Sequence, residues 1–205
     1  AMIAAFRSGG DFHAETAAKV FHVAPDQVTH EMRRQAKAVN FGIVYGISAF
    51  SLSQDIGVSV AEAKAYMEAY FATFPGVRTY MDAIVERARE QGYVETLFHR
   101  RRDLPELKSS NFNLRSFGER VALNMPIQGT AADIMKLAMI RVEQRLSGEG
   151  LAARLIMQVH DELIVECPAE EAPRVEALLQ EEMQGVARLS VPLPADAHSG
   201  PDWLS

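Results

Sequence analysis

The chain has 205 residues, which is enough for one sizeable hydrophobic core or two small ones. Its composition, 48% hydrophobic and 23% charged, is ordinary for a soluble globular protein, and no apolar run approaches the roughly 20 residues of a membrane span. Cys167 is the only cysteine, which excludes a disulfide framework and a cysteine zinc site and predicts a cytoplasmic protein. The opening residues show neither the basic start nor the long apolar stretch of a signal peptide.

The net charge of −6, taken alone, argues against a nucleic-acid-binding protein, because such proteins present a basic surface. The charge is unevenly distributed, however. Residues 98–120 hold six cations against three carboxylates, whereas residues 169–186 hold five glutamates against one arginine. This division predicts one basic working face and one acidic, solvated back.

Helices are expected to dominate the first two-thirds of the chain, where capping residues alternate with glycine or proline stops. Asp11, Thr29 and Ser48 are expected N-caps, and Ser59 followed by Glu62 has the capping-box pattern. The expected helices span residues 11–21, 29–45, 48–57, 59–73 and 77–91.

The middle of the chain predicts a short strand and two further helices. Residues 93–98 alternate in the manner of a strand, and residues 100–107 are expected to form a turn or loop. Helices should follow at 109–123 and 128–147, with a break at Pro126 between them.

The last third of the chain changes character. The apolar runs 152–159 and 162–167 stand almost adjacent and predict a β-hairpin. An acidic helix is expected at about 169–187, and residues 189–197 predict an edge strand that carries prolines. The sequence therefore predicts an α+β fold, in which a helical part precedes a small antiparallel sheet with helices packed on one face.

One segment of the second long helix repeats functional side chains every four residues. On a helix this spacing forms one ridge about 18 Å long. The ridge residues are Arg33, Lys37, Phe41 and Tyr45. Cations followed by aromatic rings match the order of parts in a nucleoside triphosphate, and Gly42 beside the ring leaves room for a base. The alternative is a plain amphipathic helix, with both rings in the core and both cations in solvent.

A second candidate site lies between the two apolar runs of the hairpin. The segment QVHDELIVE places Asp161 and Glu162 there, next to His160. Burying adjacent carboxylates costs on the order of several kcal/mol per ion unless a partner compensates them, and a divalent metal is such a partner. The alternative is an ordinary polar β-turn.

Five blocks of the sequence resemble the family A DNA polymerases. RRQAKAVNFGIVYG (33–46) resembles the R-R-x-x-K-x-x-x-F-G-x-x-Y-G signature of their fingers helix, and QVHDELIVE resembles their palm hairpin with its catalytic aspartate. The segments GYVETLFHRRRDLPEL and NMPIQGTAADIMKLAM and the ending DWLS also match, in the family's order. The resemblance implies a mostly helical fingers subdomain at 1–108, with its nucleotide-binding helix at about 30–45. It implies a partial palm at 109–205 that contains the hairpin 152–167.

The same resemblance implies template-directed DNA synthesis in replication and repair, with a DNA primer-template and deoxynucleoside triphosphates as partners. Arg33 and Lys37 are expected to hold the triphosphate, and Lys37 is a candidate proton donor to the leaving pyrophosphate. Phe41 is expected beside the sugar and base, and Tyr45 beside the template base. His13, in DFHAETA, matches a family histidine that touches the phosphates.

Contacts with DNA are expected from the segment before and after Pro126. Asn124 and Gln128 match family residues that read minor-groove acceptors shared by all base pairs, a task that suits amides. Arg120 is expected to reach the same groove or a phosphate. His160 is expected near the primer terminus. Helix capping beside the proline is the alternative for Asn124.

Other positions keep two interpretations or depart from the family. Arg100, Arg101 and Arg102 either contact the DNA backbone or are solvated in a loop. Arg34 lies one step off the ridge and is expected in solvent or in a salt bridge. His99 stands where the family commonly has glycine, which puts the local turn geometry in question.

The resemblance also implies a two-Mg²⁺ site, with Asp161 as a metal ligand and Glu162 as its support. Two-metal phosphoryl transfer needs carboxylates from two elements. The family's partner aspartate belongs to a D-Y-S-Q-I-E-L-R motif upstream of the segment that matches residues 2–21, and this sequence contains no such motif. We therefore expect half of a metal site, a chain that does not extend a primer alone, and self-association through an exposed palm edge.

Two other classes of protein remain as rivals. One is a binding module that holds DNA or nucleotide without chemistry. The other is a metal-dependent hydrolase that uses His160, Asp161 and Glu162. The hydrolase needs a further ligand cluster, and the six histidines show no short-spaced metal pattern. For the polymerase, the expected location is the cytoplasm, at the bacterial nucleoid and away from membranes.

Overall fold

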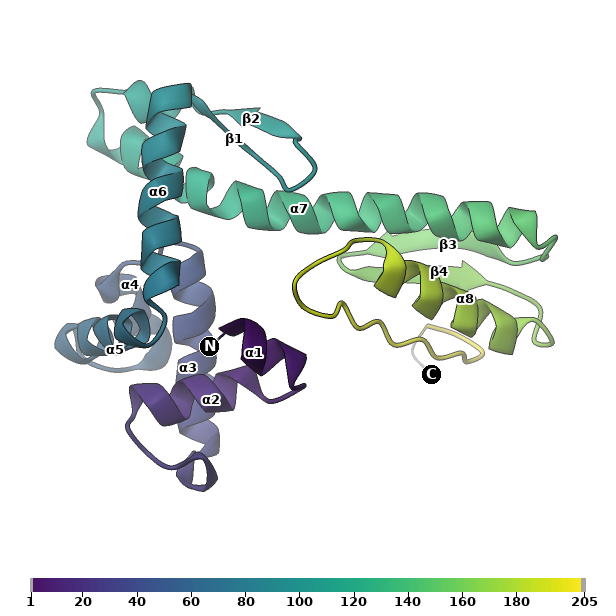
Figure 1. The fold of residues 1–205 in the computed structure, drawn as a ribbon, viewed down its shortest axis with the longest axis horizontal. Helices are drawn as coiled ribbons and strands as arrows, with labels where there is room; N and C mark the ends of the chain where they lie inside the picture. The colour runs from purple at the N-terminus through teal and green to yellow at the C-terminus, as the bar shows by residue number, and fades with distance from the viewer. Residues whose placement is uncertain (1, 204–205) are drawn as a thin grey trace. The chain divides into compact units, whose positions relative to one another are not determined.

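A computed structural model describes residues 2–203 and divides the chain into two compact units (Figure 1). Unit 1 comprises residues 1–129 and unit 2 comprises residues 130–205. Helices predominate, and the strands form two separate antiparallel pairs, so the predicted α+β class is confirmed. Within residues 2–203 no helix is both long enough and apolar enough to span a bilayer.

Most of the expected helices of unit 1 begin where their capping residues predicted. Asp11 accepts hydrogen bonds from two backbone N–H groups at the start of α2, and Thr29 and Ser48 accept one each at the starts of α3 and α4. Ser59 and Glu62 form the predicted capping box. The bounds are α2 Phe12–Val20, α3 His30–Val44, α4 Ala49–Ile56, α5 Val60–Thr73 and α6 Pro75–Gln91. The short helices α1 (Met2–Arg7) and η1 (Pro25–Gln27) were not predicted.

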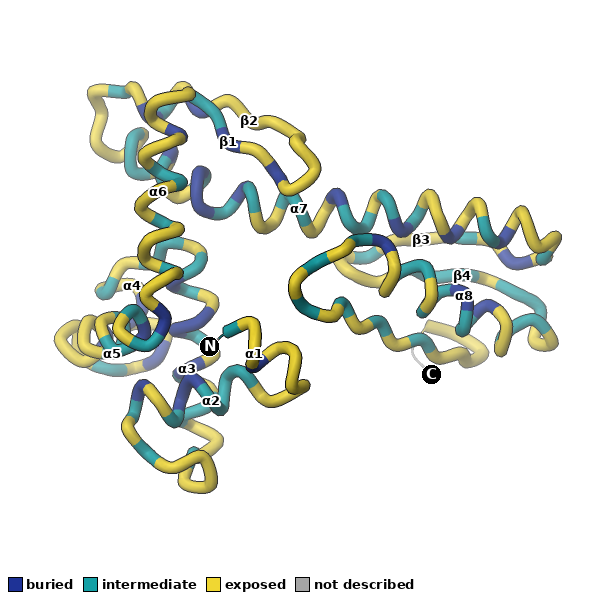
Figure 2. The backbone as a smooth tube through the Cα atoms, in the orientation of Figure 1, coloured by how far each residue is buried: buried dark blue, intermediate teal, exposed yellow. Residues whose placement is uncertain are grey.

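The main core of unit 1 forms around α3. Val39 and Ile43 pack against Leu52 of α4 and against Tyr70 and Phe74 at the end of α5. All five side chains are at most 5% exposed. In Figure 2 the buried stretches of the chain are drawn in dark blue. This packing buries one side of α3 and leaves the opposite side open.

A short hairpin replaces the predicted strand and loop in the middle of the chain. Strand β1 (Tyr93–Glu95) pairs with β2 (Arg101–Asp103), so the predicted strand is shorter than 93–98 and the loop assignment of 101–103 is wrong. The chain turns early because the Thr96 N–H donates to the carbonyl of Arg100 and because His99 adopts φ +64°. A 3-10 helix, η2 (Pro105–Lys108), follows.

Replacing His99 by glycine is expected to stabilise the protein. A left-handed backbone costs an L-residue about 1–2 kcal/mol, and the extra unfolded-state entropy of glycine offsets about half of the gain. The net increase in the free energy of unfolding should be about 0.5–1 kcal/mol, measured by chemical denaturation. His30→Gly is the control, because His30 opens α3 outside the left-handed region. A stabilising His30→Gly would contradict the conformational explanation.

Helix α7 (Phe112–Gly148) is continuous, so the predicted break at Pro126 is wrong. A proline inside a helix removes one backbone hydrogen bond and costs about 3 kcal/mol. Packing on both sides of the proline outweighs that cost. Ala122 and Met125 belong to one buried cluster, and Val142 and Leu146 belong to another.

Unit 2 contains the predicted hairpin and the acidic helix. Strand β3 (Arg154–Val159) pairs antiparallel with β4 (Glu162–Glu166), and α8 (Ala172–Gly185) follows. Side chains of α7, α8 and the hairpin form one core, which confirms that the helices pack on one face. Ile156 and Met157 remain 56% and 40% exposed.

The predicted edge strand at 189–197 is wrong. The structure gives this segment no strand pairing. Pro192 and Pro194 remove two backbone donors from a nine-residue segment, which weakens any ladder it might join. The alternation of residues in this segment therefore reflects side chains that are half-buried and exposed in turn, and not pairing with another strand.

An ion cluster joins the end of α7 to α8 in unit 2. Glu149 accepts hydrogen bonds from Arg174 (Nε–Oε2, 2.7 Å) and Arg145 (Nη2–Oε1, 2.9 Å). These two guanidinium groups lower the pKa of Glu149 to about 2. Arg145 also donates to Glu182 at 2.7 Å, so one arginine links the two helices.

Glu149→Gln is expected to destabilise the protein at neutral pH, and the deficit should shrink steadily as the pH falls below 4.5. The pKa of Glu149 lies below its unfolded value of 4.5, so its stabilisation is complete above pH 4.5 and disappears as the pH falls towards 2. Urea denaturation from pH 7 to pH 2.5 measures the difference between variant and parent. Glu143→Gln, at an exposed position of α7, should match the parent throughout. A Glu149→Gln deficit as large at pH 2.5 as at pH 7 would exclude the ionic explanation.

Candidate nucleotide-binding site

Helix α3 presents the four predicted ridge residues on the side opposite the core. Its buried side consists of Ala36, Val39, Asn40 and Ile43. Phe41 is 48% exposed and Tyr45 is 37% exposed, and Lys37 is also exposed. The alternative interpretation, with both rings in the core, is therefore wrong.

Aromatic contacts connect the ridge to α2. The rings of Phe41 and Tyr45 lie nearly parallel, with centroids 6.4 Å apart and an interplanar angle of 25°. The ring of His13 lies 5.7 Å from that of Phe41. The structure thus brings together His13 of α2 with Phe41 and Tyr45 of α3, three of the residues that the sequence predicted for nucleotide binding.

Arg33 is held by a residue that the sequence assigned only to capping. Its Nε donates to Oδ2 of Asp11 at 2.5 Å, while Oδ1 of the same carboxylate caps α2. The hydrogen bond from Arg33 lowers the pKa of Asp11, and the backbone N–H of Ala14 adds to the effect. A guanidinium has five N–H donors, so this contact fixes the arginine and leaves its terminal nitrogens for an anion.

His13 is half-buried between these charged groups. Burial lowers its pKa first, and the cations Arg33 and Lys37 lower it further, against the opposing carboxylate of Asp11. Its Nδ1 lies 2.9 Å from Nδ2 of Asn40. Sequence reasoning missed Asn40. The available signal was a polar amide on the apolar side of the helix, one position before Phe41.

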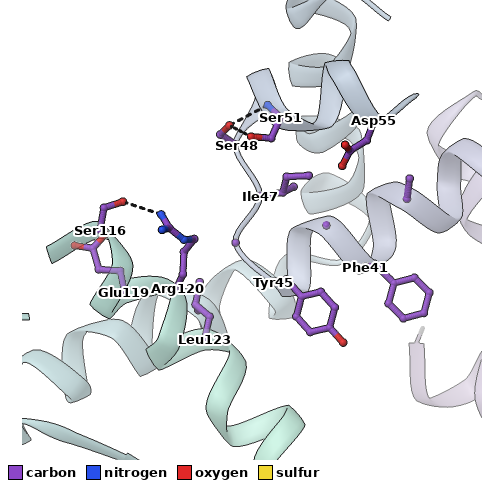
Figure 3. Close-up of a pocket in the computed structure, with 13 residues that line it drawn as sticks. Phe41, Tyr45, Ile47, Ser48, Ser51, Asp55, Ser116, Glu119, Arg120 and Leu123 are labelled. Atoms are coloured by element: carbon purple, nitrogen blue, oxygen red, sulfur yellow. Dashed lines mark hydrogen bonds between the residues drawn. The ribbon is translucent and has the colours of Figure 1, made fainter. Parts of the chain in front are cut away.

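A cavity of about 700 Å³ opens at the C-terminal end of the ridge (Figure 3). Phe41 and Tyr45 of α3 line it, together with Arg120 and Leu123 of α7. Gly42 also lines the cavity, but the structure shows a second reason why this position is a glycine. A Cβ there would lie 2.8 Å from Cγ2 of Ile47, so the missing side chain lets Ile47 pack against α3.

Three predicted DNA contacts follow one another at intervals of four residues on α7. Arg120 is exposed, and its Nη1 donates to Oγ of Ser116 at 3.3 Å (Figure 3). Asn124 lies inside the helix, so the capping alternative is wrong. Its Oδ1 is buried and has no hydrogen-bond partner within residues 2–203, whereas Gln128 is exposed.

Several arginines have partners within the chain. Arg100 donates to the carbonyl of Gly129 at 2.9 Å, and the guanidinium of Arg101 lies 3.7 Å from the ring centroid of Tyr93. Arg102 is exposed on β2. Arg34 donates to Glu31, which confirms the predicted salt bridge off the ridge.

The acidic residues lie at the tip of the β3–β4 hairpin in unit 2. His160 and Asp161 form its two-residue turn, His160 with φ +52°, and Glu162 opens β4. All three are exposed, so the expectation that the carboxylates are buried between strands is wrong. The local structure is therefore the polar β-turn that the sequence offered as the alternative. A role of these residues in metal binding stays a prediction.

The exposed tip still suits one kind of ion. Mg²⁺ commonly takes one or two carboxylates and completes its shell with water and substrate phosphates. Asp161 offers such a carboxylate, and Glu162 is adjacent. Within residues 2–203 the structure shows no group of three or more acidic, histidine or cysteine side chains that could hold a metal. The residues therefore fit one contribution to a shared site.

The cations and rings of α3 and the aspartate of the β3–β4 turn are among the residues by which the sequence resembles the family A DNA polymerases. The family model described as DNA polymerase family A matches residues 1–205. The chain belongs to this family.

Known proteins resemble the chain over nearly its whole length. DNA polymerase I of Geobacillus stearothermophilus is 56% identical over 202 residues, and that of Bacillus subtilis strain 168 is 55% identical over 202 residues. Each match covers 98% of this chain and 23% of the relative, so the chain spans about a quarter of their length. A solved structure, the POL domain of Pol1 from M. smegmatis in complex with DNA primer-template and dNTP, superposes with a TM-score of 0.89 at 48% identity. That match covers 94% of this chain and 34% of the solved one.

Proposed function

We propose that this chain serves template-directed DNA synthesis, as the part of a DNA polymerase I type enzyme that binds the incoming deoxynucleotide. The observation that carries the proposal is the exposed ridge of α3, which gathers cations and rings beside His13. The 48% identical solved structure is a complex with primer-template and dNTP, which supports the same partners here. The reaction adds a nucleotide to a primer 3′ end in replication or repair.

The ridge would stabilise the charge that develops on the triphosphate. Arg33 is pre-oriented by Asp11, and Lys37 stands one turn further along the same face. Fixed cations aimed at the phosphates act without reorganisation during the reaction. Lys37 also has a transferable proton for the departing pyrophosphate, whereas Arg33 does not release its proton.

The rings and the α7 residues would hold the base pair. Phe41 is placed to pack against the sugar and base, and Tyr45 lies at the cavity where a template base would stand. Arg120, Asn124 and Gln128 are spaced to follow a groove along α7. Amides suit the minor groove because its acceptors differ little between base pairs. From the family resemblance we propose residues 1–108 as fingers and residues 109–205 as palm, a boundary that lies within unit 1.

The hairpin tip would supply one side of a Mg²⁺ site. Bound Mg²⁺ lowers the pKa of an attacking hydroxyl and neutralises charge on the pyrophosphate. Asp161 would ligate the ion, Glu162 would support it, and His160 would lie by the primer terminus. Among residues 2–203 no three acidic, histidine or cysteine side chains gather as a metal site, and the sequence lacks the family's partner-aspartate motif, so we propose that the chain alone does not extend a primer.

Two further properties belong to this proposal. Strands β3 and β4 pair only with each other in the part of the chain that the structure describes, which leaves two open edges. Open edges favour self-association. Work on DNA also implies a location at the bacterial nucleoid.

An exchange of segments tests the proposed function. In DNA polymerase I of Geobacillus stearothermophilus, the 202 residues that match this chain are replaced by it; we call the product the exchanged polymerase. We expect Mg²⁺-dependent primer extension that follows the template, and none from the isolated chain. A folded exchanged polymerase without extension would contradict the proposal.

The isolated chain separates the two rival functions. Tight binding of labelled duplex and of a deoxynucleoside triphosphate, without extension in the exchanged polymerase, would indicate a binding module. Metal-dependent cleavage of a phosphodiester substrate that Asp161→Asn abolishes would indicate a hydrolase.

A further inference from the structure

A buried polar cluster lies directly beneath the ridge. Thr16 of α2 is fully buried and Asn40 of α3 is 5% exposed. Nδ2 of Asn40 lies 2.9 Å from Nδ1 of His13 and 3.3 Å from Oγ1 of Thr16. Asn40 therefore joins the two helices that form the ridge, and it contacts a predicted phosphate-binding side chain from below.

The hydroxyl of Thr16 determines which end of the Asn40 amide faces His13. Oγ1 of Thr16 donates its single proton to the carbonyl of Phe12 at 2.8 Å. Only lone pairs remain on that oxygen, so its contact with Asn40 requires the amide NH₂ group. Because the same nitrogen faces His13, Nδ1 of the imidazole must accept the second hydrogen.

The opposite amide orientation is the poorer arrangement. In the observed orientation the Asn40 amide uses both of its N–H donors, and of its two polar atoms Oδ1 alone lacks a hydrogen-bond partner among residues 2–203. Rotating the amide would place two N–H groups at that unpartnered position. It would also draw the Thr16 proton away from the carbonyl of Phe12. Two unpaired donors cost more than one unpaired acceptor.

We propose that Asn40 is a positioning residue that fixes His13 as the Nε2–H tautomer, so that a neutral N–H donor faces the triphosphate. The part of this inference that concerns the triphosphate rests on the proposed function, whereas the assignment of the tautomer does not. A neutral imidazole has one donor and one acceptor nitrogen. With Nδ1 committed to Asn40, Nε2 carries the proton. The wrong tautomer would present a lone pair to an anion.

The charges around His13 agree with a neutral ring. Arg33 and Lys37 of α3 face it as cations, and Asp11 at the start of α2 faces it as an anion. Burial and the two cations lower the pKa of His13 below its usual value despite Asp11. Protonation would in addition place Nδ1–H against the N–H of Asn40, donor against donor.

Nuclear magnetic resonance of the full chain tests the tautomer without reference to activity. Imidazole ¹⁵N shifts identify the protonated nitrogen, and His13→Gln assigns the resonance among the six histidines. We expect Nε2–H in the parent and in Thr16→Ser, which keeps the hydroxyl. Thr16→Val, which lacks it, should let the amide rotate and give a mixture of tautomers. An Nδ1–H tautomer in the parent overturns the proposal, as does a Thr16→Val spectrum identical to the parent's.

Asn40→Asp should reverse the polarity of the contact. A carboxylate accepts the Nδ1 proton and raises the pKa of His13 by about one unit or more. In the exchanged polymerase, KM for the deoxynucleotide should then rise severalfold as the pH passes upward through that value, because the neutral ring loses Nε2–H. The parent's KM should stay flat over the same range. A flat profile for Asn40→Asp overturns the positioning role.

The outcomes separate this inference from the proposed function. An inactive exchanged polymerase combined with the Nε2–H tautomer would contradict the function and leave the assignment of the tautomer standing. An active exchanged polymerase combined with the Nδ1–H tautomer would contradict the inference alone. If Asn40→Asp does not fold, its backbone amide resonances will lose their chemical-shift dispersion. The comparison of Thr16→Ser with Thr16→Val then still decides the tautomer by itself.

Discussion

Asp161→Asn in the exchanged polymerase is expected to lower kcat for nucleotide addition by about 10³-fold. Asparagine keeps the size of the side chain and the two-residue turn but removes the negative charge that would hold Mg²⁺. Metal stabilisation of a phosphoryl-transfer transition state is worth several kcal/mol, and each 1.36 kcal/mol is a factor of about ten. Single-turnover primer extension at saturating deoxynucleotide measures the change in rate. The KM for the deoxynucleotide should move little.

The same hairpin offers a matched control. Glu166 ends β4 at the opposite end from the turn and is also exposed. Glu166→Gln removes one charge from the same element and should leave kcat within about twofold. Equal losses in both variants would point to damage of the hairpin. An unaffected Asp161→Asn would place the metal elsewhere.

Local chemistry explains why so much of the fold was predictable. The caps Asp11, Thr29, Ser48 and Ser59 act within three residues of themselves, so their effect can be read from neighbouring letters. The Pro126 break failed for the opposite reason. The stabilisation that keeps α7 continuous comes from side chains distant in sequence, such as Val94 and Leu104 against Ala122.

The site was predictable where its residues share one element. A spacing of four residues places the ridge on one face of α3 whatever surrounds the helix. The partners beneath it were not predictable, because Asp11 reaches Arg33 across 22 residues and Asn40 reaches His13 across 27. Such contacts depend on how α2 crosses α3, which no local pattern specifies. His99 was predictable in part. The sequence marked its turn as unusual because the family commonly has glycine there, and the structure explains that preference by the φ of +64° at this position.

Lys37→Ala in the exchanged polymerase is expected to lower kcat/KM for the deoxynucleotide by about 10²–10³-fold. The ammonium is exposed on the ridge, one turn after Arg33, where it would meet charge that grows on the phosphates. Loss of charge alone should raise KM, whereas loss of proton donation should lower kcat. Steady-state extension of a single nucleotide across a range of concentrations measures both constants.

Two variants separate these contributions and control for helix damage. Lys37→Arg keeps the positive charge but cannot release its proton, so it should restore KM while kcat stays low. Arg34→Ala removes a cation from the same helix, but Arg34 is paired with Glu31 off the ridge, and kcat/KM should change by no more than about twofold. If Arg34→Ala matched Lys37→Ala, general electrostatics of α3 would explain both losses. Full activity in Lys37→Arg would leave charge as the whole contribution of this position.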